Sequence, residues 1–208
     1  MAEDRSRAPQ ARTRLARRAV LDAARILFLE RGYGATTIEG ISNAADIPQA
    51  TVYRLFSSKK GILKALLDTS IAGDDEPVPV AERSHVRPLL DATLPVDSLA
   101  RLAAVSVDIN NRIAPIYRIL VSAASSDTDA AAILDELTRQ RQAGQGRVAA
   151  ALARAKALRP GLRASDAGDV IHALASPELY HLLVVDRAWS PERYQRWLAE
   201  TLAEQLLP

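Results

Sequence analysis

Apolar residues recur along most of the 208-residue chain at intervals of three and four, the spacing of an amphipathic helix. The first such stretch is expected to end near Gly32, because glycine favours the left-handed conformation just past a helix. A literal capping-box match, Thr36-x-x-Glu39, predicts that a second helix starts at Thr36 or Thr37. Since no alternating strand pattern of useful length appears, the chain is expected to be all-helical.

Two more short helices are predicted after a tight turn at Asp46-Ile47. Pro48 suits the first turn of the third helix, where its missing N–H has no partner to lose. Ser57 or Ser58 is the expected cap of the fourth. A short helix, a turn of about three residues and a second short helix are typical of a helix-turn-helix. In that motif the second helix of the pair enters the DNA major groove.

Residues 73–95 break the pattern with four prolines and an acidic run, and predict a loop with one short helix near 86–92. Pro177 is expected to kink or split the helical pattern around it. Ser165 and Ser190 are the expected caps of the last two helices. Beyond the loop, helices are predicted at about 96–113, 115–124, 128–157, 165–186 and 190–206.

The charge is divided unevenly along the chain, although its total is only +2. Residues 1–64 hold 12 Lys+Arg and 6 Asp+Glu, a net charge of +6, whereas residues 65–208 hold 15 and 19, a net charge of −4. A basic head on an acidic body favours a nucleic-acid-facing part joined to something else. The basic head coincides with the predicted helix-turn-helix.

Composition excludes several classes of protein. The absence of cysteine excludes disulfides, thiol nucleophiles and cysteine-bound metal clusters. No stretch approaches about 18 uninterrupted apolar residues, and the N-terminus lacks the apolar core of a secretory signal, so a cytoplasmic protein is expected. No G-x-S-x-G, H-E-x-x-H or P-loop sequence is present, so an enzyme is not expected. His172 and His181 are nine residues apart, on opposite helix faces, so neither a metal site nor a cofactor is predicted.

The third helix carries side chains suited to DNA. Gln49 can read adenine or bridge to a phosphate, and Thr51 offers both a hydroxyl and a methyl group. Arg54 can reach a phosphate or pair with guanine. The expected DNA contacts are Thr36, Thr37, Gln49, Ala50, Thr51, Tyr53, Arg54, Lys59, Arg12 and Arg14.

Residues 1–16 are predicted to form a basic flexible arm, which contains Arg12 and Arg14. Such an arm can enter an adjacent minor groove, as homeodomain arms do. Alternatively, it is a solvated tail that only raises the rate of association with DNA. The sequence leaves both interpretations open.

A family resemblance rests on several stretches within residues 17–67: Gly32-Tyr33-Gly34-Ala35-Thr36-Thr37-Ile38, Ile41, Ala45-Asp46-Ile47, Ala50-Thr51-Val52-Tyr53-Arg54-Leu55-Phe56, and Ser58-Lys59-Lys60 with Leu63. In order, spacing and residue type they resemble the DNA-binding domain of the TetR family of bacterial repressors. Three positions depart from that family's pattern. Asp46 stands where a glycine is usual, Pro48 where a serine cap is common, and Ser42 where an alanine is common.

The resemblance implies an all-α homodimer that binds duplex DNA at a palindromic operator. Residues 17–64 would form a three-helix helix-turn-helix domain, and residues 65–208 a larger helical domain for effector binding and dimerisation. The last two helices would form the four-helix bundle of the dimer. Their expected interface residues are Ile171, Leu174, Leu179, Leu182, Leu183, Trp197, Leu198, Leu202 and Leu206.

By the same resemblance, the helices between residues 96 and 157 would hold a small-molecule effector. The chain has only nine aromatic residues, so an aliphatic pocket for a small lipophilic effector is favoured over aromatic stacking. The candidate polar contacts are Asn110, Asn111, Arg112, Tyr117, Arg118 and Ser122. The leading hypothesis is therefore a repressor that an effector releases from its operator. The alternative is a regulator of the same fold without a small-molecule effector, driven by a protein partner or acting as an activator.

Overall fold

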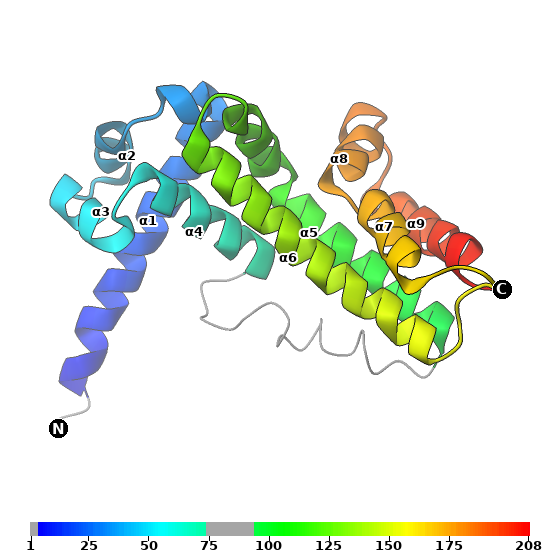
Figure 1. Ribbon diagram of the computed structural model, residues 1–208. Helices are drawn as coiled ribbons and strands as arrows, with labels where there is room; N and C mark the ends of the chain where they lie inside the picture. Colours follow the sequence, from blue (N-terminus) through cyan, green and yellow to red (C-terminus); the bar gives the residue numbers. More distant parts are fainter. Residues whose placement is uncertain (1–3, 74–93) are drawn as a thin grey trace. The chain divides into compact units, whose positions relative to one another are not determined.

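The computed structural model describes residues 4–73 and 94–208, and every regular element in these ranges is a helix (Figure 1). The all-helical prediction is confirmed for this part of the chain. Most of the predicted loop at 73–95, with its short helix at 86–92, lies outside the described residues. In chain order the elements are α1 (Asp4–Ala35), α2 (Ile38–Ala45), α3 (Gln49–Phe56), α4 (Lys59–Ala72), α5 (Pro95–Ala124), α6 (Thr128–Arg154), α7 (Ala164–Leu174), α8 (Pro177–Tyr180), the π-helix η3 (His181–Asp186) and α9 (Pro191–Leu206).

The chain forms two compact units. The N-terminal unit consists of Met1–Thr69 together with Pro115–Leu134, and the C-terminal unit of Ser70–Ala114 together with Asp135–Pro208. This division differs from the one expected at residue 64, because the segment Pro115–Leu134 joins the helix-turn-helix. A boundary drawn from charge and motif alone cannot find such a segment, since it is distant in sequence.

The first helix starts earlier than the sequence predicted. α1 begins at Asp4, so most of the segment expected to be a flexible arm is helical. Near its other end the helical conformation is interrupted at Gly32, whose φ of 77° lies in the region that glycine tolerates best. The predicted end of the helix near this glycine is therefore confirmed.

The second helix is capped by Thr37, and the capping box predicted for Thr36 does not form. The Thr37 side chain accepts a hydrogen bond of 3.0 Å from the Gly40 N–H. Thr36 is buried, and its hydroxyl lies 3.2 Å from the Leu27 carbonyl oxygen and 2.8 Å from that of Gly32. Thr36 therefore ties the start of the motif to α1.

The turn between α2 and α3 is built from the residues that depart from the family pattern. Asp46 takes the left-handed conformation, with φ 53° and ψ 41°, which aspartate tolerates better than most residues. The buried Ser42 hydroxyl donates a 2.6 Å hydrogen bond to the Ile47 carbonyl and closes the turn. Pro48 is the N-cap residue of α3 and not a member of its first turn, because its carbonyl accepts from the Thr51 and Val52 N–H groups.

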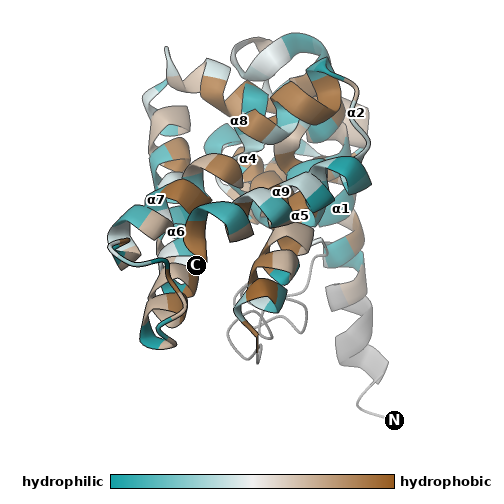
Figure 2. Ribbon diagram, turned by 90° about the vertical axis from the view of Figure 1, so that its right-hand side faces the viewer, coloured by the Kyte–Doolittle hydropathy of each residue, from teal (hydrophilic) through white to brown (hydrophobic). Residues whose placement is uncertain are grey.

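Apolar side chains from all four N-terminal helices form the core that supports the helix-turn-helix. Brown hydrophobic and teal hydrophilic residues interleave along the ribbon, as amphipathic helices require (Figure 2). Those of α1 to α4 with less than 2 % of their surface exposed are Val20, Ala24, Phe28, Ile41, Val52, Ile62 and Leu63.

The two helices predicted at 96–113 and 115–124 are a single helix, α5, which continues through Pro115. A proline inside a helix costs a hydrogen bond and crowds the preceding turn. The helix continues because Ile113 and Ala114 before the proline, and Ile116 and Tyr117 after it, are all buried. Packing on both sides thus outweighs the local preference.

The C-terminal unit follows the predicted break at Pro177. α7 ends at Leu174, and Ser176 caps α8 by accepting a 3.1 Å hydrogen bond from the Leu179 N–H. Ser190 caps α9 as predicted, but Ser165 lies inside α7 and is not its cap. The core of this unit is formed by α5, α6, α7, α8 and α9, and its largest wholly buried side chains are Leu99, Ile171, Tyr180, Tyr194 and Leu198.

Candidate nucleic-acid interface

The recognition helix α3 buries one side and exposes the other. Val52 and Phe56 are 1 % and 6 % exposed and hold the helix to the core. Gln49, Ala50, Tyr53 and Arg54 are exposed along the opposite side, and Tyr53 keeps 49 % of its surface accessible. Gln49 and Tyr53 are four residues apart, as are Ala50 and Arg54, so these side chains form one continuous surface of the helix. Thr51 lies half-buried at its edge.

The first turn of α3 has no side-chain cap, because Pro48 occupies the N-cap position. Exposed N–H groups at a helix start carry a partial positive charge that attracts phosphate. Pro48 fixes the entry of the chain into the helix without placing a carboxylate or hydroxyl over those groups. This turn therefore suits contact with a polyanion.

The two expected DNA contacts at the start of α2 differ in their exposure to solvent. Thr37 is exposed, and its hydroxyl caps α2. Thr36 is only 2 % exposed, and its hydroxyl already bonds within the protein. The prediction that Thr36 contacts DNA is therefore wrong, because the side chain cannot reach a phosphate.

Lys59 is held by the protein and does not extend freely toward DNA. Its ammonium donates a 2.8 Å hydrogen bond to the Tyr33 carbonyl, and a second, at 3.5 Å, to the Gly34 carbonyl. The same ammonium lies 4.2 Å from the centroid of the Tyr33 ring, a cation–π contact. Lys59, which was predicted to contact DNA, therefore links α4 to the end of α1.

Arg12 and Arg14 are exposed on the helical start of α1, so the structure leaves both available to a partner. Arg17, three residues before the buried Val20, instead places its guanidinium 4.9 Å from the centroid of the Phe56 ring. The basic residues of this segment thus have two environments, one open to solvent and one packed on the end of α3.

Comparisons with known proteins agree with this geometry. Residues 20–66 match the family model described as bacterial regulatory proteins, tetR family. Over 128 residues the chain is 31% identical to the HTH-type transcriptional repressor Rv3405c of Mycobacterium tuberculosis, covering 56% of this chain and 68% of that protein. The chain belongs to the TetR family of bacterial regulators. It is thus a DNA-binding transcriptional regulator with a helix-turn-helix.

Other relatives extend the likeness of this TetR-family chain. The HTH-type transcriptional regulator YvkB of Bacillus subtilis is 44% identical over 48 residues, which is 23% of this chain and 25% of that protein. NalD of Pseudomonas aeruginosa, the secondary repressor of a multidrug efflux pump, has the same fold, with a TM-score of 0.68 at 23% identity, covering 94% of this chain and 98% of that one. SmeT, solved as a triclosan complex, gives a TM-score of 0.68 at 19% identity, covering 93% and 92%.

The six predicted effector contacts of this TetR-family chain do not form one cluster within either unit. Asn110, Asn111 and Arg112 belong to the C-terminal unit, whereas Tyr117, Arg118 and Ser122 belong to the N-terminal unit. The prediction that they jointly line a pocket is therefore not supported. A pattern of polar residues on one long helix cannot reveal that the helix serves two units.

The three residues in the C-terminal unit have structural partners. Asn110 is 3 % exposed, and its amide donates a 3.2 Å hydrogen bond to the Ala175 carbonyl. Arg112 donates to the carbonyls of Ser70 and Ile71 in the last turn of α4. Asn111 accepts a 3.1 Å hydrogen bond from the Tyr180 hydroxyl. These side chains secure helix ends and breaks, where backbone groups otherwise lack partners.

The predicted dimer residues divide into two groups. Ile171, Leu198, Leu202 and Leu206 are 0 % exposed within a single chain, so they belong to its core and their assignment to an interface is wrong. Leu174, Leu179, Leu183 and Trp197 are partly exposed, and Leu182 is 49 % exposed. Val185, which was not among the predicted interface residues, is 55 % exposed on η3, three positions after Leu182.

Two titratable groups of the C-terminal unit have shifted pKa values. Burial, with a smaller effect of the Arg141 charge, lowers the pKa of His172, whose Nδ1 lies 2.7 Å from the Gln145 Oε1. Burial also raises the pKa of Tyr194, whose hydroxyl donates to the Leu174 carbonyl at 2.9 Å. Both groups remain neutral at pH 7 and act as packing and hydrogen-bonding residues.

Among the described helices, none is both long and apolar enough to cross a membrane.

Proposed function

We propose that this TetR-family regulator is a repressor that reads a palindromic operator through the exposed face of α3. The observation that carries the proposal is that face itself, where Gln49, Ala50, Tyr53 and Arg54 stand outward from a helix anchored by buried Val52 and Phe56. An anchored helix with polar and cationic side chains on its open side suits the major groove, which admits one helix.

The exposed residues divide the work of recognition. Gln49 and Arg54 can hydrogen-bond base edges, and Ala50 allows the backbone to approach closely. Thr37, Thr51 and Tyr53 offer hydroxyls for phosphates, which fix the position of the protein without reading sequence. Arg12 and Arg14 add charge on α1 and serve the same positioning role.

A homodimer would place two such helices on the two halves of one site. The support is the apolar surface that a single chain leaves open at Leu182 and Val185 on η3. Leu179 and Leu183 nearby in sequence, and Trp197 on α9, are half-buried. A two-fold dimer reads both halves of a palindrome about one DNA turn apart. Leu174 completes the proposed interface.

Release of the operator by a small molecule completes the proposal. Its support is family membership and the SmeT relative, which was solved with triclosan. An effector lowers DNA affinity by binding more tightly to a form of the dimer whose recognition helices do not fit the site. The alternative is regulation by a protein partner, with no small-molecule effector.

The DNA proposal is tested by selecting bound sequences from a random duplex library with the full chain. We expect enrichment of one motif with two-fold symmetry and half-sites about one helical turn apart. Binding to the selected duplex should also weaken steeply with salt, since each phosphate contact adds about −0.9 to the slope of log affinity against log salt. Enrichment of an asymmetric motif, or of none, would contradict the proposal.

The effector proposal needs a separate test. A thermal-shift screen of lipophilic metabolites and drugs should give compounds that raise the melting temperature. Those compounds should also release the selected duplex in a titration. A screen without any stabilising compound would favour the partner-driven alternative.

A further inference from the structure

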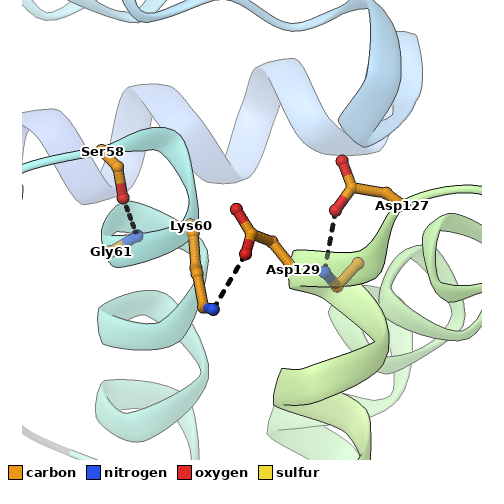
Figure 3. Close-up of polar contacts among 6 residues, drawn as sticks. Ser58, Lys60, Gly61, Asp127 and Asp129 are labelled. Atoms are coloured by element: carbon orange, nitrogen blue, oxygen red, sulfur yellow. Dashed lines mark hydrogen bonds and ion pairs between the residues drawn. The ribbon is translucent and has the colours of Figure 1, made fainter.

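Three segments of the N-terminal unit meet at the start of α4, namely the end of α1, the first turn of α4 and the start of α6. The Lys60 ammonium of α4 donates a 2.9 Å hydrogen bond to the Asp129 carboxylate of α6 (Figure 3). Asp127 caps α6 by accepting from the Ala130 N–H at 2.9 Å, and Ser58 accepts from the Gly61 N–H at 3.1 Å (Figure 3). These caps define where both helices begin, so the ion pair joins two fixed points.

The first turn of α4 is held by two neighbouring lysines that point to different partners. Lys60 bonds to Asp129, which is 69 residues away in sequence. Lys59 bonds to the Tyr33 carbonyl and covers the Tyr33 ring. Tyr33 precedes the N-cap residue of α2, Thr37, by only four positions. The contact that Lys59 makes with Tyr33 therefore lies close in sequence to the start of the helix-turn-helix.

The two carboxylates at the start of α6 affect the ionisation of Tyr33. Burial, together with the charges of Asp127 and Asp129, raises the pKa of Tyr33 to about 12. The ring is thus neutral at any physiological pH, and it packs 5.5 Å from the centroid of the Phe28 ring. The end of α1, the lysines of α4 and the acids of α6 form one electrostatic cluster.

We propose that Lys60 and Asp129 are a positioning pair for DNA binding. Their ion pair holds the first turn of α4 against α6. By fixing this turn, it also fixes the Lys59–Tyr33 contact just before α2. Both contacts keep the helix-turn-helix in the arrangement that presents α3 to DNA. Asp129 contacts no DNA in this account and acts only through Lys60. The proposal rests on the DNA interface proposed above.

The chain offers a closely matched control. Lys64 and Asp68 form a second pair in the N-terminal unit, 3.5 Å apart, with 53% and 59% of their side-chain surfaces exposed, against 40% and 60% for Lys60 and Asp129. The control pair lies within α4 and joins no second helix. Asp129→Asn and Asp68→Asn therefore remove the same charge from similarly exposed pairs, and only the first removes a link between helices.

The experiment measures the affinity of each full-length variant for the duplex selected by the wild-type chain, by fluorescence anisotropy at several salt concentrations. Asp129→Asn should weaken binding by up to about fivefold, the ceiling for an exposed ion pair. Asp68→Asn should change it less than about twofold, as expected for a surface pair within one helix. The salt slope should be the same for all three proteins, because no phosphate contact is lost.

Reversal of the pair tests whether the ion pair itself, and not the identity of either side chain, supports DNA binding. The double variant with Lys60→Asp and Asp129→Lys should recover affinity to within about twofold of the wild type, because it restores the link with opposite polarity. Equal effects of Asp129→Asn and Asp68→Asn would overturn the proposal. It would also be overturned by tighter binding of Asp129→Asn with a steeper salt slope, since Lys60 would then be a phosphate contact that Asp129 restrains. If the wild-type chain selects no duplex, the proposed function itself fails.

Discussion

The outer faces of α3 and of η3 differ in chemistry, although both belong to short helical segments. α3 buries Val52 and Phe56 and exposes polar and cationic residues around Tyr53. η3 instead exposes Leu182 and Val185. A polar, cationic face gains by meeting phosphates and base edges, whereas an apolar face gains by leaving water. The two surfaces therefore suit the two partners proposed for this chain, DNA for α3 and a second copy of the chain for η3.

The largest expected effect comes from comparing a buried and an exposed leucine of the C-terminal unit, Leu198 and Leu182. Leu198→Ala should lower the free energy of unfolding by about 2–5 kcal/mol, because a wholly buried leucine leaves a cavity when truncated. Urea denaturation at one fixed protein concentration measures this loss, since the stability of a dimer depends on concentration. A loss below about 1 kcal/mol would show that Leu198 is not a core residue.

Leu182→Ala is the matched variant on the exposed face of η3. It should raise the dissociation constant of the dimer about tenfold or more, as truncation of an interface anchor does. Sedimentation equilibrium at several concentrations provides the measurement. Unchanged self-association would remove η3 from the proposed interface and leave its exposed leucine unexplained.

Two glycines, one in each unit, differ in the space available for a Cβ atom. A Cβ atom on Gly61 would collide with the Phe56 carbonyl oxygen, at the point where α3 passes into α4. Gly61→Ala should therefore destabilise the chain by about 1–3 kcal/mol. Gly146 lies inside α6 with open space at its Cβ position, so Gly146→Ala should instead stabilise by about 0.5–1 kcal/mol. Thermal unfolding of both variants gives the comparison, and two shifts of the same sign would contradict it.

Ala188, two positions after the end of η3, offers a smaller effect. Ala188 has a φ of 53°, a left-handed conformation that glycine adopts at lower cost than alanine. Ala188→Gly should therefore keep or slightly raise the stability, by up to about 1 kcal/mol, although alanine-to-glycine changes usually destabilise. Thermal unfolding checks the sign. A loss of about 1 kcal/mol would mean that this turn is not left-handed in solution.

The smallest expected effect is a pH dependence confined to the C-terminal unit. Burial lowers the pKa of His172 in the folded chain below its ordinary value near 6.5, so folding favours the neutral ring. The stability from this group is present above that value and is lost as the pH falls through the folded pKa. Between pH 7 and pH 5 the wild type should lose more stability than His172→Gln, measured by denaturation at each pH. Parallel losses would exclude His172 as a source.

Local signals in the sequence predicted the local structure well. The glycine at the end of α1, the Ser190 cap and the break at Pro177 were all predicted correctly, because each depends on neighbouring residues only. The helix-turn-helix itself was predicted for the same reason. The prediction that Thr36 caps α2 and contacts DNA was wrong. Its hydroxyl bonds to carbonyls of α1, which are not part of the local capping motif.

What the sequence could not provide was contact between distant residues. The leucine spacing of α9 is the same whether its leucines pack within their own chain or across a dimer, so Leu198, Leu202 and Leu206 were predicted to lie at an interface. Nothing near Lys60 in the sequence indicates Asp129, because the two residues are 69 positions apart. Pro115 lies inside a continuous helix because burial on both sides outweighs a local rule.

The central claim is that the exposed face of α3 reads DNA. The most direct test is an anisotropy titration of the selected duplex with Arg54→Ala and, separately, Tyr53→Ala, with the oligomeric state of each variant followed by sedimentation. We expect Arg54→Ala to bind about tenfold or more weakly, the range for loss of a base or phosphate contact of about 1–3 kcal/mol, with self-association unchanged. Normal binding by both variants would contradict the placement of the recognition helix.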